Sequence, residues 1–142
     1  FISNQKRFHQ IKKEYGMKNL PSPAVVTSNI DAGKSIKYIV NHSELTMSDT
    51  MISDNACLML FNLLQKMGID EIHVAGFDGY HTNVERNYYA RNLINNTDRE
   101  KLRQINKHIQ KYMERIESHM QVHYLTESMY DRSRNDVQSI QE

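Results

Sequence analysis

The most constraining feature of this 142-residue chain is an apolar helix followed almost at once by a strand. Residues 53–68 predict the helix, with Ser53 or Asp54 as N-cap and Gly68 at its end. Its segment NACLMLFNLLQKM is apolar on most sides, so the helix must be covered on more than one face. The strand pattern of residues 70–77, DEIHVAGF, follows after a turn of about two residues, which is typical of the αβ step of a parallel sheet.

The rest of the chain alternates helices and strands in the same way. A helix ending at Gly16 follows a cap at Ser3 or Asn4, and a long charged helix runs from Thr97 or Asp98 to about residue 118. Polar connectors are expected over 30–35 and 41–49, and strands over residues 1–3, 24–29, 36–40 and 121–126. This order predicts an α/β fold, a Rossmann-like, doubly wound, mainly parallel sheet flanked by helices.

Length and composition limit the classes of protein to which the chain can belong. We expect one domain, residues 1–126, with a C-terminal extension over 127–142. The net charge of +1 does not favour binding to nucleic acid. The longest apolar run, which Asn62 interrupts, is too short to span a membrane. Cys57 is the one cysteine, which excludes an internal disulfide and fits a cytoplasmic setting. Its apolar helical surroundings favour core packing over a role as nucleophile.

Short polar side chains follow several of the predicted strands. Asn4, Asn29, Gly76, Asp78 and Tyr80 all lie where a strand ends. Because ligands of doubly wound sheets bind outside the carboxyl ends of the strands, these residues predict a rim that binds a nucleotide or nucleotide sugar. The alternative is that Asn and Asp only terminate strands and form turns.

Two other segments have a binding and a structural interpretation. Ser53 begins the apolar helix, whose N–H groups suit an anion, although the charge of Asp54 favours plain capping. Tyr88 and Tyr89 lie among arginines in a polar loop, where they can hold a phosphate or form a lid packed on its own domain.

The seven histidines are scattered and predict no metal site. His73 alternates with core positions in a strand, and His42 and His81 lie in polar loops. None belongs to a metal-ligand spacing, so we expect neither metal nor cofactor. The GKS at 33–35 lacks the first glycine and the following helix of a phosphate-binding P-loop.

Two quoted segments resemble known families. FISNQKRFHQIKKEYG with AVVTSN, and MISDNACLMLFNLLQKMGIDEIHVAGFDGY, resemble bacterial sialyltransferases that use CMP-sialic acid, and the Rossmann-like domains of motility-accessory and pterin diphosphokinase-like proteins are similar. SDNACLMLFNLLQKMG with AGFDGY also resembles the C-terminal domain of bacterial proteins that begin with an HMG-CoA-lyase-like aldolase barrel, often labelled 4-hydroxy-2-oxovalerate aldolase.

The sialyltransferase resemblance implies a set of residues that contact the nucleotide part of a donor. It implies no catalytic residue, because the expected histidine base aligns near NLINNTD, which holds no histidine, and the Gly-rich first loop would precede Phe1. The implied contacts are Asn4, Ser53, Gly76, Asp78 and Tyr80, with Tyr88 or Tyr89 at the phosphate.

We therefore expect an accessory, non-catalytic domain that binds a nucleotide or nucleotide sugar. The aldolase-like resemblance implies that an aldolase barrel lies upstream of Phe1 on the same polypeptide. One alternative is a sialyltransferase-like glycosyltransferase with His81 as its base. Another is a structural domain that forms a homo-oligomer through the long helix and the tail.

Overall fold

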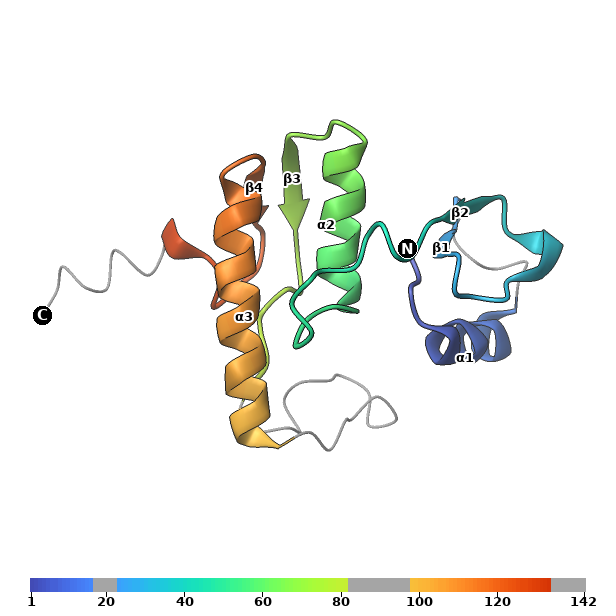
Figure 1. The fold of residues 1–142 in the computed structure, drawn as a ribbon, viewed down its shortest axis with the longest axis horizontal. Helices are drawn as coiled ribbons and strands as arrows, with labels where there is room; N and C mark the ends of the chain where they lie inside the picture. Colours follow the sequence, from blue (N-terminus) through green and yellow to red (C-terminus); the bar gives the residue numbers. More distant parts are fainter. Residues whose placement is uncertain (17–22, 82–97, 134–142) are drawn as a thin grey trace, which may run out of the picture. The chain divides into compact units, whose positions relative to one another are not determined.

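The computed structural model describes residues 1–16, 23–81 and 98–133. These residues form helices and short parallel strands, in the order α1, β1, β2, α2, β3, α3 and β4 (Figure 1). The fold class is therefore α/β, as predicted. The chain divides into two compact units, Phe1–Met67 and Gly68–Glu142, and each is described by itself.

The first helix, α1 (Gln5–Tyr15), has the two ends that the sequence predicts. The Asn4 side chain caps its start and accepts a hydrogen bond of 3.1 Å from the backbone N–H of Arg7. Gly16 ends it with a φ of 72°, and its N–H donates to the Lys12 carbonyl over 3.0 Å. Phe8 is the side chain that this helix buries.

The strands of the first unit are parallel. β1 (Val25–Thr27) pairs with β2 (Tyr38–Val40), with Val26 opposite Ile39. On the other side of β1, Ile2 forms a parallel bridge to Val26. The extended N-terminus, β1 and β2 thus all run in one direction, and β1 lies between the other two. The buried core of this part of the unit consists of Phe8, Val26, Ile30, Ala32 and Ile36.

Helix α2 (Ala56–Lys66) begins later than the sequence predicts. Neither Ser53 nor Asp54 is its N-cap. Asn55 takes that position, because its Oδ1 accepts from the N–H groups of Cys57 and Leu58 over 3.1 and 3.2 Å.

The segment before α2 is more than the polar connector that the sequence predicts over 41–49. Leu45 and Met47 are buried there, and the Asn62 side chain of α2 donates to the Leu45 carbonyl over 2.8 Å. The burial of Leu45 and Met47 was not predicted, because each stands alone among polar residues and the segment shows neither the alternation of a strand nor the spacing of a helix.

The second unit is a β-α-β arrangement. β3 (Glu71–Val74) and β4 (Gln121–Tyr124) are parallel neighbours, and α3 (Arg99–Glu117) lies between them in sequence (Figure 1). Both strands are shorter than predicted. Their pairing continues at each end through hydrogen bonds from Gln121 N to the Asp70 carbonyl and from Leu125 N to the Val74 carbonyl.

Helix α3 is amphipathic and starts at a predicted cap. The Asp98 side chain accepts from the N–H of Glu100 over 3.1 Å. The helix buries Leu102, Ile109, Met113 and Ile116. Within the described ranges, no helix is both long and apolar enough to cross a membrane.

The first unit depends on Phe8, whose side chain is 1% exposed. We expect Phe8→Ala to lower the free energy of unfolding by about 3–5 kcal/mol, because it leaves a cavity beside Val26. Met67→Ala is the control, since Met67 is 66% exposed, and it should change stability by less than about 0.5 kcal/mol. Urea unfolding followed by circular dichroism measures both. Equal losses in the two variants would show that Phe8 is not part of the core.

Candidate functional site

The structure brings Asn4 and Asn29 to the same edge of the first unit. Asn29 Nδ2 donates to the Ser3 carbonyl over 3.2 Å, and its Oδ1 accepts from the Thr27 hydroxyl over 2.5 Å. Both asparagines are exposed and follow parallel strand segments, as predicted. Their side chains make the hydrogen bonds of a helix cap and a strand end, so the structural interpretation accounts for each of them.

Ser53 lies outside the first turn of α2. It is part of the turn over residues 51–54, and its carbonyl accepts from the N–H of Met47 over 3.3 Å. The predicted placement of Ser53 at the helix start is therefore wrong. Asn55 occupies the N–H groups that an anion would have used.

In the second unit, the loops after β3 and β4 meet at the carboxyl ends of both strands. The N–H of Gly76 donates to Thr126 Oγ1 over 2.9 Å, and that hydroxyl donates to Asp78 Oδ1 over 3.3 Å. All three residues are exposed, and Gly76 has a φ of 71°. Gly76, Asp78 and Thr126 are called the β3–β4 rim below.

The chain that follows Thr126 holds the loop after β3 in place. Ser128 Oγ donates to the Phe77 carbonyl over 2.5 Å, and the N–H of Met129 donates to the Asp78 carbonyl over 3.1 Å. The ring of Tyr130, which is 1% exposed, packs on Phe77 with centroids 4.8 Å apart. The backbone around Asp78 is therefore fixed by these two hydrogen bonds and by the packing of the partly buried Phe77 on the buried Tyr130.

Tyr80 is anchored through its backbone. Asn106 of α3 accepts from the N–H of Tyr80 over 2.9 Å and donates to its carbonyl over 2.7 Å. The hydroxyl of Tyr130 donates to the same Asn106 Oδ1 over 2.9 Å. One amide thus joins both loops to the long helix.

Gly79 adopts a backbone conformation in this loop that favours glycine. Its φ is 94°, and a Cβ at this position would overlap the Met129 side chain. The backbone angle favours glycine at this position, whereas the Met129 side chain is flexible and exposed and can turn aside.

Sequence reasoning found one side of this site and missed the other. Of the predicted residues, Gly76 and Asp78 are joined through Thr126 beyond the strand ends, and Tyr80 is held by Asn106 of α3. Thr126, Ser128, Asn106 and Tyr130 were missed. A signal was available, because Thr126 ends the strand predicted over 121–126 and Ser128 follows it closely, as Asp78 follows β3. Tyr88 and Tyr89 lie outside the described residues.

A hollow of about 330 Å³ opens at the opposite, amino ends of β3 and β4. Three of the side chains around it are the carboxylates of Asp70, Glu71 and Glu117. Such a lining repels a phosphate, so we do not place an anionic ligand in this hollow. The full lining is Asp70, Glu71, Glu117, Ser118, His119, Met120 and Gln121.

Cys57 has the surroundings of a packing residue. Burial in α2 raises the pKa of its thiol from an ordinary 9.0 to about 11, because the low dielectric disfavours the thiolate. A nucleophilic cysteine needs the opposite shift.

Comparison of the chain with protein-family models, with curated proteins and with solved structures found no match. The resemblances to sialyltransferases and to aldolase-associated domains therefore stay predictions.

The anchoring role of Asn106 is open to a stability test. We expect Asn106→Ala to lower the free energy of unfolding by about 1–3 kcal/mol, because the buried hydroxyl of Tyr130 and the Tyr80 backbone lose their partner. Gln110→Ala, one turn later on an exposed position of α3, is the matched control and should cost under about 0.5 kcal/mol. Chemical denaturation of both variants provides the comparison. A neutral Asn106→Ala would contradict the described link.

The raised pKa of Cys57 predicts slow reaction with thiol reagents. At pH 8 the native protein should react about a hundredfold more slowly than the protein unfolded in urea. The reason is that raising the thiol pKa from 9.0 to about 11 lowers the thiolate fraction at pH 8 by about that factor. The native rate should still climb tenfold per pH unit between pH 9 and 10, whereas the unfolded rate levels off near its own pKa. Stopped-flow labelling with a disulfide reagent measures both, and equal rates at pH 8 would refute the shift.

Proposed function

We propose that this chain is a Rossmann-like accessory domain that binds a nucleotide or nucleotide sugar at the β3–β4 rim. The observation that carries the proposal is the parallel register of β3 and β4, with the exposed Gly76, Asp78 and Thr126 beyond their carboxyl ends. Ligands of open parallel sheets bind outside the carboxyl ends of the strands, which is the edge where this rim lies.

The chemistry of the rim suits the hydroxyl groups of a sugar. The Asp78 carboxylate is exposed and can accept hydrogen bonds from ribose or hexose hydroxyls. The Thr126 hydroxyl and the backbone bonds beneath Asp78 keep it in place before a ligand arrives, which lowers the entropy lost on binding. The lack of a side chain at Gly76 lets a ligand approach the backbone closely.

The family resemblance supports the same site. The Gly-x-Asp-x-Tyr segment that resembles the nucleotide contacts of sialyltransferases corresponds to Gly76, Asp78 and Tyr80. Tyr88 and Tyr89 are proposed as phosphate contacts on the resemblance alone. We assign no catalytic residue, and we propose that any aldol chemistry belongs to a barrel elsewhere on the same polypeptide.

Titration calorimetry of the whole chain with CMP, a CDP-sugar and a UDP-sugar tests this function. We expect saturable binding of at least one, weakened about tenfold or more by Asp78→Asn, because a hydrogen bond to a charged group contributes about 1.5–3 kcal/mol. Asp70→Asn is the matched control, since it removes the same charge at the amino end of the same strands and should leave binding unchanged.

Two results would overturn the proposal. Absence of heat with all three ligands would remove nucleotide binding altogether. Binding that resists Asp78→Asn but falls on Asp70→Asn would place the ligand in the acidic hollow and not at the rim.

A further inference from the structure

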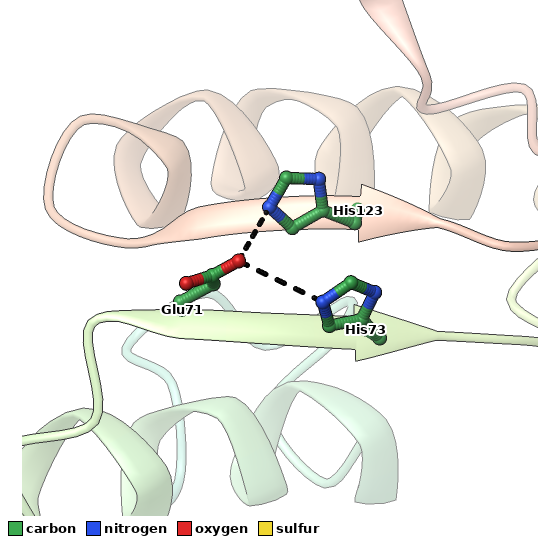
Figure 2. A group of neighbouring side chains, drawn as sticks. All are labelled: Glu71, His73 and His123. Atoms are coloured by element: carbon green, nitrogen blue, oxygen red, sulfur yellow. Dashed lines mark ion pairs between the residues drawn. The ribbon is translucent and has the colours of Figure 1, made fainter.

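A cluster of three metal-ligating side chains lies on one face of the β3–β4 pair. Glu71 and His73 are two residues apart on β3, so their side chains leave the strand on the same face, with Ile72 buried between them. The parallel register places His123 of β4 directly beside His73. Figure 2 shows the three side chains gathered above the two strands.

The spacing of the ligand atoms fits one small metal ion. His123 Nε2 lies 3.1 Å and His73 Nε2 lies 3.7 Å from the same oxygen, Glu71 Oε1. All three ligand atoms lie within 4.8 Å of one another. In a tetrahedral zinc site with bonds of about 2.0–2.1 Å, neighbouring ligand atoms are about 3.3 Å apart. The two measured distances bracket that value.

We propose that Glu71, His73 and His123 bind a divalent transition-metal ion of the Zn²⁺ class. Two imidazoles and one carboxylate suit Zn²⁺ and its first-row neighbours, whereas Mg²⁺ and Ca²⁺ prefer oxygen ligands alone. Three protein ligands leave a fourth coordination position for water or a small anion.

The surrounding charge favours a cation. Glu71 also lines the acidic hollow, together with Asp70 and Glu117. These carboxylates set up a negative potential beside the cluster, which raises the local concentration of divalent cations.

The arrangement is close to the bound geometry without having reached it. The imidazoles of His73 and His123 are stacked, with centroids 4.6 Å apart and planes at 17°. Each ring must turn about its last side-chain torsion for both Nε2 atoms to point at one ion. Both side chains have room for that rotation, because they are 57% and 46% exposed.

Metal binding by the whole chain tests the proposal directly. Calorimetry with ZnCl₂ should give one site per chain with a dissociation constant in the micromolar range or below. Co²⁺ should give the intense visible absorption bands of a four-coordinate site. His73→Ala, His123→Ala and Glu71→Gln should each weaken binding at least about tenfold, since even the loss of an outer-shell partner costs that much.

The control is His9→Ala, which removes an exposed histidine of α1 and should leave the Zn²⁺ affinity unchanged. Circular dichroism confirms that the variants fold, as expected for exposed positions. Binding that is weaker than micromolar, or that survives both His73→Ala and His123→Ala, would overturn the proposal. Because the cluster lies on the sheet face and not at the β3–β4 rim, loss of nucleotide binding leaves this result unaffected.

Discussion

Parallel pairing of β3 with β4 is the constraint on which the second unit depends. Two parallel neighbours cannot be joined by a hairpin, so the chain must cross back along the sheet before it can form the second strand. Here α3 makes that return, and its buried apolar residues supply much of the core of the unit. The pairing also sends both strands toward the same edge, so the loops that follow them meet although about fifty residues of chain separate them.

The same register produces two kinds of surface. Along the strands, alternation places Ile72 inside and the charged or ring-bearing Glu71 and His73 outside. At the strand ends, the backbone leaves the ladder, and polar side chains such as Asp78 and Thr126 complete each other's hydrogen bonds. A one-residue slip of β4 would move His123 away from His73 and to the other face, and would separate Thr126 from Gly76.

Much of this fold follows from local sequence patterns, and the rest depends on contacts between distant segments. The caps at Asn4 and Asp98, the parallel strands and the exposed alternation of His73 could be predicted, because each signal lies within a few residues. The cap at Asn55 was missed because Ser53 and Asp54 are equally good caps in sequence, but both belong to the turn over residues 51–54 that precedes Asn55. The meeting of His73 with His123 depends on the register of two strands fifty residues apart, which no local pattern encodes. The burial of Tyr130 was missed for the same reason, since its partners Phe77 and Asn106 belong to other elements.

Tyr130 has a consequence for how the molecule is made. It lies beyond the last strand, yet its ring and hydroxyl tie together the loop after β3 and the middle of α3. During synthesis on the ribosome, β3 and α3 emerge before this residue, so the loop after β3 can bond to Asn106 of α3 but lacks the ring of Tyr130 until the chain beyond β4 is available. Contacts between segments so far apart in sequence must first overcome the entropy of closing the intervening chain, which slows their formation. The edge of the sheet that we propose for ligand binding therefore gains its aromatic contact only once Tyr130 has been made, and a nascent chain that stalls before Tyr130 lacks that contact.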